Sequence, residues 1–168
     1  MPRIEQIVLE TASEEVKRAV EQHLAQGYRL TNEKRTLLHN VTAFRALEEE
    51  SYALDRELQK FVGKRASDFF EYAISVQNDC LVCSTYFTKL LRENGIEDFA
   101  SFEFTPQEKL LVEYGQAIAR DPKNVPDELF EALRKEFSTE ALVVLTTMGV
   151  FMIANNYFND ILQVEPEA

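Results

Sequence analysis

The sequence is short of the residues that mark several classes of protein. Of its 168 residues, five are glycine, five are proline and two are cysteine. So few glycines and prolines exclude a collagen-like or linker-like chain. A chain of 19.4 kDa buries roughly 70% of its unfolded surface on folding, so it needs no disulfide or metal ion to be stable.

Positive charge is also scarce. The 18 basic residues face 29 acidic ones, which gives a formal net charge of −11. Phosphate groups are repelled by such a surface, so neither nucleic acid nor an anionic membrane is expected as a partner. With 45% hydrophobic and 28% charged residues, the composition is that of a soluble globular protein and excludes disorder. The length predicts one domain.

No segment of the chain is typical of a secreted or membrane protein. The first ten residues carry charges where the apolar core of a signal peptide should run. The longest apolar stretch, from Ala141 to Ala154, is too short to span a bilayer and suits a buried helix. We therefore expect a cytoplasmic protein in a reducing compartment.

Capping residues and helix-ending glycines divide the chain into seven or eight expected helices, with no convincing strand. We predict an all-α fold. The last helix is apolar nearly all round, so it should be buried by its own domain or partly by another subunit. The expected helices run from a capping box at Thr11 to Glu14 up to Gly27, from Thr31 to near Asn40, from Val41 to Val62, from a cap at Ser67 to Asn78, through the cysteines to Asn94, from a capping box at Thr105 to Glu108 up to Asp121, from Pro126 to Phe137, and from Ser138 to about Leu162.

The two cysteines, Cys80 and Cys83, form a Cys-x-x-Cys pair. Three interpretations compete: half of a zinc site, a redox dithiol, or two buried apolar side chains. Zinc usually takes four ligands, and there is no second cysteine pair. His23 and His39 also lack a suitable spacing to the dithiol, so no metal is expected. The redox dithiol is favoured over plain burial.

A helix start at the dithiol would give it reactivity. With Asn78 or Asp79 as the N-cap, Cys80 lies in the first turn and Cys83 one turn further on the same face. The N-terminus of a helix favours a thiolate, and two cysteines three residues apart can close a disulfide. The carboxylate of Asp79 opposes this by raising the thiol pKa. This argument nominates Cys80 as the nucleophile and Cys83 as the resolving thiol.

A polar stripe precedes the dithiol on the expected helix, opposite its Phe and Ile face. It contains Asp68, Glu71, Tyr72 and Ser75. Such a stripe is commonly a solvated face. The functional alternative is that Asp68 or Glu71 faces the cysteines and transfers protons.

Several segments together resemble the carboxymuconolactone decarboxylase/AhpD-like alkylhydroperoxidase family. The resemblance covers the start of the chain at Pro2 to Ile4, the stretch from Gly27 to Phe44, the dithiol with an acid twelve residues before it, and the Asn-containing final helix. In the last of these, the matching segment is Met152-Ile153-Ala154-Asn155-Asn156.

The chain departs from the family pattern at three positions. Asp68 stands where the family usually has Glu, and Phe87 stands where it has a histidine four residues after the second cysteine. Val82 lies between the cysteines, where the AhpD proteins have a second histidine. Because the family histidine pairs with the second cysteine, the resemblance points to Cys83 as the attacking thiol, against the helix-start argument for Cys80. The order of attack stays open.

The resemblance implies a single compact AhpD-like bundle over residues 1–168. Residues 1–30 would form an N-terminal arm with the first helix, and residues 65–95 a dithiol helix pair. It also implies assembly as homo-trimers or homo-hexamers. The implied activity is that of a thiol-dependent peroxidase or disulfide reductase without a cofactor, acting on a hydroperoxide or an oxidised partner protein through Cys80, Cys83 and Asp68. Without the histidine, proton transfer to and from the cysteines would be slow, would pass through Glu71 or Tyr86 instead, or would be lost.

Two other functions compete with this one. A decarboxylase-like enzyme acting on a small lactone acid would need a cationic site, and the acidic chain has few convergent arginines for it. A non-catalytic homo-oligomer would use its cysteines as packing residues or as a passive redox sensor.

Overall fold

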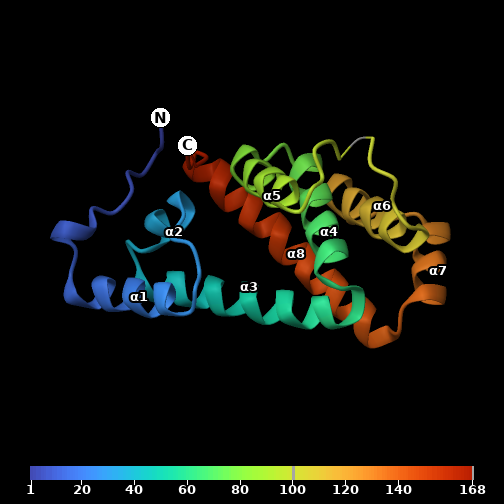
Figure 1. The fold of residues 1–168 in the computed structure, drawn as a ribbon, viewed down its shortest axis with the longest axis horizontal. Helices are drawn as coiled ribbons and strands as arrows, with labels where there is room; N and C mark the ends of the chain where they lie inside the picture. The colour runs from blue at the N-terminus through green and yellow to red at the C-terminus, as the bar shows by residue number, and fades with distance from the viewer. Residues whose placement is uncertain (100, 168) are drawn as a thin grey trace.

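The computed structural model describes residues 1–99 and 101–167, and within them it contains eight α-helices, one short 3-10 helix and no strand. The predicted all-α fold is therefore confirmed (Figure 1). The 3-10 helix is η1 (Leu9–Thr11), and the α-helices are α1 (Glu14–Ala25), α2 (Asn32–Leu37), α3 (Val41–Val62), α4 (Lys64–Gln77), α5 (Leu81–Glu93), α6 (Pro106–Arg120), α7 (Asp127–Glu136) and α8 (Thr139–Leu162).

Two long helices, α3 and α8, cross each other and carry the rest of the chain (Figure 1). α4 packs on both of them and also lies against α5 and α6. α7 covers the far ends of α6 and α8, and α1, α2 and the N-terminal arm gather at the beginning of α3. The dithiol segment lies in the turn between α4 and α5, so the fold places it beside the C-terminal half of α8.

The main core lies where α4, α6 and α8 meet, and two glycines let these helices approach closely. A Cβ atom at Gly149 of α8 would lie 2.3 Å from Ile118 Cδ1, and one at Gly115 of α6 would lie 3.0 Å from the Phe70 carbonyl oxygen. Phe70 and Ile74 of α4 fill this crossing and are completely buried. Close packing of this kind fixes the position of α4, and with it the polar stripe, against α8.

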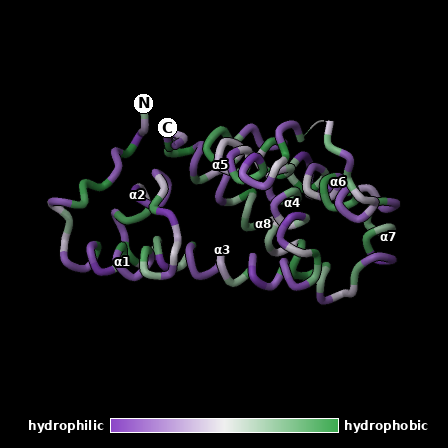
Figure 2. Tube along the Cα trace, in the orientation of Figure 1, coloured by the Kyte–Doolittle hydropathy of each residue, from purple (hydrophilic) through white to green (hydrophobic). Residues whose placement is uncertain are grey.

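Two smaller clusters flank the main core. α1 and α2 bury Val16, Val20 and Leu38 against Phe44 at the beginning of α3. On the other side of α4, Phe69 meets a group of aromatic rings from the segment before α6 (Phe99, Phe102 and Phe104). These clusters hold both ends of the molecule to the central helices (Figure 2 maps the hydropathy along the chain).

Several predicted helix boundaries are confirmed. α3 runs from Val41 to Val62 and ends at Gly63, whose φ of 79° lies in the region that favours glycine. The capping box of Thr105 and Glu108 is present in both directions, with Pro106 at the first helical position.

Two predicted caps are wrong. α1 is capped by Ser13, whose hydroxyl accepts from the Val16 N–H, whereas Thr11 belongs to η1. α4 begins at Lys64 directly after Gly63, so Ser67 is a buried residue inside the helix instead of its cap. The Ser67 hydroxyl donates to Glu71 Oε1 at 3.0 Å.

α8 confirms the predicted helix from Ser138 to about Leu162 and extends beyond the apolar stretch of Ala141 to Ala154 at both ends. Of the helices in the described part of the chain, it alone is long and apolar enough to cross a membrane by length and composition. One side of it packs in the core through residues such as Leu145, Met148 and Met152. The other side exposes a stripe of large apolar side chains, with exposed fractions between 53% and 60% (Val143, Val150, Tyr157 and Ile161).

Candidate active site

A tight turn between α4 and α5 positions the dithiol. Asp79 has a φ of 56°, in the left-handed region that non-glycine residues seldom adopt, and this lets the chain reverse direction within three residues. Asn78 fixes the turn to α8 by donating from Nδ2 to Asn156 Oδ1 at 3.0 Å. Cys80 itself is the N-cap of α5 and Cys83 lies in the first turn, so the prediction of Asn78 or Asp79 as the cap is wrong by one or two residues.

The two thiols are free and buried. A hydrogen bond from the Cys83 side chain lowers the pKa of Cys80, and the backbone N–H of Cys83 acts in the same direction. The same contact raises the pKa of Cys83, and burial raises it further. The two cysteine side chains are therefore in contact one turn apart, which is the arrangement that a disulfide between them needs.

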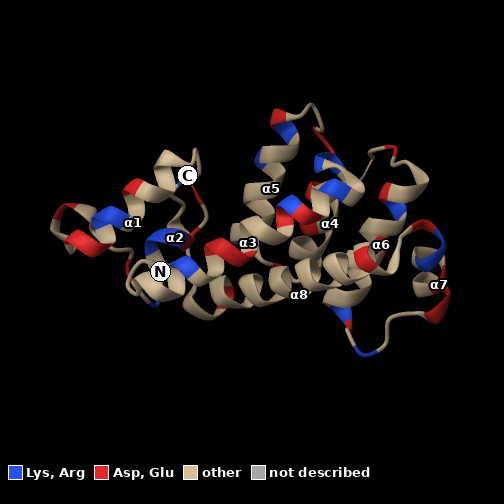
Figure 3. Ribbon diagram, turned by 90° about the horizontal axis from the view of Figure 1, so that it is seen from below, with Lys and Arg blue, Asp and Glu red and all other residues tan. Residues whose placement is uncertain are grey.

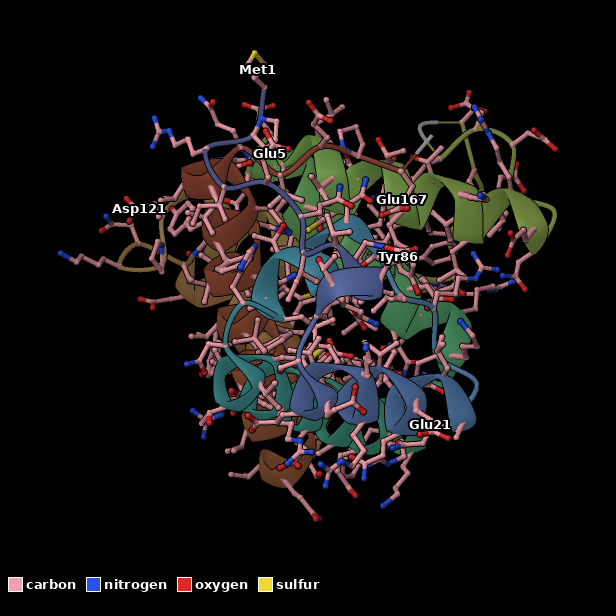
Figure 4. All side chains as sticks on the ribbon, turned by 90° about the vertical axis from the view of Figure 1, so that its left-hand side faces the viewer. Met1, Glu5, Glu21, Tyr86, Asp121 and Glu167 are labelled. Atoms are coloured by element: carbon pink, nitrogen blue, oxygen red, sulfur yellow. The ribbon has the colours of Figure 1, made fainter. Side chains whose placement is uncertain are left out.

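A cavity of about 460 Å³ reaches Cys83 from the side of α3. Its wall is built from α2, α3, α4, α5 and α8 and from Glu167 near the C-terminus. Tyr86 and Glu167, which both line it, are labelled in Figure 4. Cys83 is 5% exposed and lines the cavity, whereas Cys80 is completely buried behind it. A small molecule in this cavity therefore meets Cys83 first.

Two amides of α8 and one carboxylate of α2 surround the Cys83 sulfur. Asn159 Nδ2 lies 3.3 Å from Cys83 Sγ and 3.2 Å from Glu33 Oε2. Asn155 Nδ2 makes the longer pair of contacts, 3.9 Å to the sulfur and 3.4 Å to the same carboxylate oxygen. Burial raises the pKa of Glu33, and the Asn159 hydrogen bond partly offsets this. The amide oxygens of Asn155 and Asn159 are buried and lack a hydrogen-bond partner among the described residues.

The polar stripe of α4 is not a solvated face. Asp68, Glu71 and Ser75 are all buried, and both acids line the cavity. Asp68 is paired with Lys64, whose Nζ lies 2.7 Å from Asp68 Oδ2, and Figure 3 shows basic and acidic residues adjacent on α4. Burial raises the pKa of Asp68. It raises the pKa of Glu71 well above its ordinary value, with the charge of Asp55 adding to the effect.

Phe87 stands where the related family has a histidine, and both histidines of the chain have partners elsewhere. Phe87 is 6% exposed and lies in the cavity wall one turn after Cys83, so the position of the family histidine faces the site but carries no titratable group. His23 is used elsewhere, with Nδ1 3.2 Å from Glu48 Oε2, and His39 bonds the Glu5 carbonyl. Across residues 1–99 and 101–167, no group of three or more His, Cys, Asp or Glu side chains is arranged to hold a metal ion.

The structure thus brings Cys80, Cys83 and Asp68 to one region and adds two residues that sequence reasoning missed. These two residues are Glu33 and Asn159, which no local pattern marks, whereas Asn155 belongs to the segment that carries the resemblance. Asparagine side chains in an otherwise apolar helix were the available signal, because a buried amide needs a partner. Nothing in the sequence pairs Glu33 with the dithiol, since this contact exists only in the tertiary structure.

The structure is that of an all-helical protein with a buried dithiol beside a cavity. Comparison with solved structures identifies its fold. No protein-family model and no curated protein matches the chain. Among solved structures, an uncharacterized peroxidase-related protein from a Silicibacter species is similar over 99% of this chain and 92% of its own, with a TM-score of 0.81 and 13% identity.

Two further solved structures point the same way. An uncharacterized peroxidase-related protein from Ralstonia eutropha, described as an alkylhydroperoxidase AhpD core, has a TM-score of 0.76 and 19% identity over 99% of this chain and 92% of its own. A protein of unknown function from Agrobacterium tumefaciens, suggested to be an antioxidant defence protein AhpD, has a TM-score of 0.62 and 23% identity over 75% of this chain and 91% of its own. The chain therefore has the AhpD-like fold.

Proposed function

We propose that this protein is a thiol oxidoreductase of the AhpD-like family that reduces a small organic hydroperoxide with the Cys80/Cys83 dithiol. The observation that carries the proposal is the position of Cys83, in the wall of a 460 Å³ cavity and hydrogen-bonded to Cys80 behind it. The fold shared with peroxidase-related proteins supports the same reaction class.

The reaction has two steps. Although the pKa of Cys83 is raised and that of Cys80 lowered, Cys83 is the sulfur that a substrate in the cavity can reach. Its thiol loses its proton and attacks the terminal oxygen of the hydroperoxide, so that the O–O bond breaks, an alcohol leaves and Cys83 becomes a sulfenic acid. Cys80 then attacks the Cys83 sulfur, which releases water and forms the disulfide. Two electrons and two protons from a dithiol reductant return the protein to its starting state.

Burial favours a small substrate over an oxidised protein. With Cys83 5% exposed and Cys80 completely buried, a protein disulfide cannot reach either sulfur unless the helices separate. The amide oxygen of Asn155, which lines the cavity, lacks a hydrogen-bond partner among the described residues and needs a donor. The O–H of a hydroperoxide can donate to it, whereas a disulfide cannot.

Asp68 keeps a place in the proposal as an acid that exchanges protons with the site through water in the cavity. Its carboxylate lines the same cavity as Cys83. The cytoplasm is the expected location, because a reducing compartment keeps the dithiol available.

The cavity suits a lactone acid less well. Two of the three cationic side chains that line it are paired with carboxylates, Lys34 with Glu48 and Lys64 with Asp68. A carboxylate substrate would meet Glu33 and Glu71 in the same space.

Treatment of the reduced protein with cumene hydroperoxide tests the proposal. We expect stoichiometric alcohol formation and a mass loss of two hydrogens from an intramolecular disulfide. Cys80→Ser should stop at a Cys83 sulfenic acid that dimedone traps, while Cys83→Ser should give no rapid reaction. Thiols that stay unreactive, or that form only intermolecular adducts, would refute the proposal.

A further inference from the structure

The Glu33 carboxylate accepts hydrogen bonds from the same two amide nitrogens that contact the Cys83 sulfur. One amide nitrogen, Asn159 Nδ2, contacts both groups, at 3.2 Å from Glu33 Oε2 and 3.3 Å from Cys83 Sγ. Asn155 Nδ2 bridges the same two groups at longer distances. Asp160 contacts the Cys80 thiol, but no carboxylate other than Glu33 in the described part of the chain shares a hydrogen-bond donor with Cys83.

From this arrangement we infer that Glu33 takes the proton from the Cys83 thiol and returns it to the leaving alcohol. It would thus do from α2 the work of the histidine that this chain lacks at Phe87. The inference rests on the hydroperoxide reduction proposed above.

The other acids of the cavity have different partners. Asp68 is bound by Lys64 through both carboxylate oxygens, and Glu71 accepts from the Ser67 hydroxyl. Asp55, which also lines the cavity, accepts from Gln59 and Ser67. These contacts hold the three acids on the α3 and α4 side, whereas Glu33 lies with the amides that touch the sulfur.

Glu33 and Cys83 disfavour each other's negative charge. The contact with Cys80, at the N-cap of α5, raises the pKa of Cys83 most, burial raises it further, and ionised Glu33 adds to both effects. Burial likewise raises the pKa of Glu33, while Glu48 on α3 opposes its ionisation and Lys34 on α2 favours it. α8 presents the neutral amides of Asn155 and Asn159. The pair therefore favours a single negative charge, on either Glu33 or Cys83, over ionisation of both groups.

Each proton in the step is accounted for. The resting pair is a Glu33 carboxylate and a Cys83 thiol, and proton transfer gives a carboxylic acid beside a thiolate. The thiolate attacks the terminal oxygen of the hydroperoxide and displaces an alkoxide. The Glu33 carboxylic acid protonates the alkoxide, which restores the carboxylate and leaves Cys83 as the sulfenic acid.

Two reagents separate this role from a structural one. Iodoacetamide needs only a thiolate, whereas cumene hydroperoxide also needs a proton for its leaving group. In Cys80→Ser protein, Glu33→Gln should reduce the rate of peroxide reaction at Cys83 at least tenfold. It should leave alkylation unchanged or make it faster, because removal of the negative charge favours the thiolate.

The matched control is Glu108→Gln, which alters a buried glutamate that lies outside the cavity against Arg65. It should change neither rate. Parallel loss of both reactions in Glu33→Gln, or no loss in either, would overturn the role of Glu33. Failure of the protein with native Glu33 to react with the peroxide would instead refute the proposed function itself.

A measurement without a Glu33 substitution gives an independent test if Glu33→Gln does not fold. In Cys80→Ser protein, the ratio of peroxide rate to alkylation rate should fall as the pH rises, because fewer thiolates then have a protonated Glu33 beside them. A ratio that stays constant from mildly acidic to mildly alkaline pH would overturn the inference.

Discussion

Glu33 and Cys83 accept hydrogen bonds from the same amide nitrogen, that of Asn159, although 126 residues separate Glu33 from Asn159 in the sequence. Asn159 is 1% exposed, so neither contact competes with bulk water. In such surroundings a proton moves between two fixed groups without solvent having to reorganise. The amide thus links a thiol on α5 to a carboxylate on α2, two helices that are far apart in the sequence.

The buried acid Glu71 predicts how stability depends on pH. Its pKa is raised well above the ordinary 4.5, first because burial penalises the carboxylate. The folded protein therefore binds this proton more tightly than the unfolded chain, so the contribution to stability is complete below pH 4.5 and is lost as the pH rises toward the folded pKa. Glu71→Gln removes this loss and keeps an acceptor for the Ser67 hydroxyl.

We accordingly expect Glu71→Gln to be more stable than the native chain at mildly alkaline pH, and this advantage to shrink as the pH is lowered. Urea unfolding followed by circular dichroism at several pH values measures it. Glu131→Gln on exposed α7 provides the control, since that acid is paired only with surface Arg134. An advantage that does not change with pH would contradict the assignment.

The outer face of α8 predicts self-association. Val143, Val150 and Tyr157 recur every seven residues and are more than half exposed, as is Ile161. An apolar stripe on a helix of this length is typical of a subunit interface. We expect at least a dimer by light scattering, and a trimer or hexamer in line with the family resemblance.

Val150→Asp should dissociate the assembly, because it places a charge in the middle of the stripe. The fold should tolerate the change, with a loss in stability of no more than about 1 kcal/mol, since the side chain is exposed. Val76→Asp, an equally simple change at an exposed valine of α4, should leave the assembly intact. A native chain that is monomeric at micromolar concentration would contradict this prediction.

Local signals in the sequence predicted most of the helices. Gly63 and the capping box of Thr105 and Glu108 specify their boundaries through neighbouring backbone groups alone, and both predictions are confirmed. Capping patterns fail where several hydroxyls compete. Thr11 and Ser13 are two residues apart and either can cap a helix, and Ser67 resembles a cap although its hydroxyl serves Glu71.

Only those features of the site whose residues lie close together in the sequence were predictable. The Cys80 and Cys83 spacing indicated a dithiol, and the four-residue spacings of Asp68 and Glu71 to neighbouring polar residues indicated a stripe. Whether that stripe was solvated depended on how α4 packs on α3 and α8, which the sequence does not encode locally. Glu33 could not be found, because only the packing of α2 against α8 brings it to the sulfur.

The last prediction concerns Asp68 and Phe87, two of the three positions near the dithiol where the chain differs from the AhpD-like pattern that it resembles. Both line the cavity with Cys83. If Asp68 exchanges protons with the site through water, Asp68→Asn should slow oxidation of the dithiol by a hydroperoxide at least tenfold, since help with proton transfer is worth roughly 10²–10⁴ in rate. Stability should stay within about 1 kcal/mol, because Asn keeps the shape of the side chain and the exposed ammonium of Lys64 stays solvated without its partner. Phe87→His should accelerate the reaction, because it places a group with an ordinary pKa of about 6.5 one turn from Cys83.

Stopped-flow measurement of disulfide formation in both variants and in the double variant checks these expectations. Phe87 is 6% exposed and packs in the main core, so Phe87→His should also lower the unfolding temperature, and the rates must be compared where each variant is fully folded. Phe87→Gln, also polar but unable to exchange a proton at neutral pH, separates proton transfer from mere loosening of the cavity. Acceleration by Gln equal to that by His would assign the gain to access, and native rates in Asp68→Asn would leave Asp68 as a structural partner of Lys64.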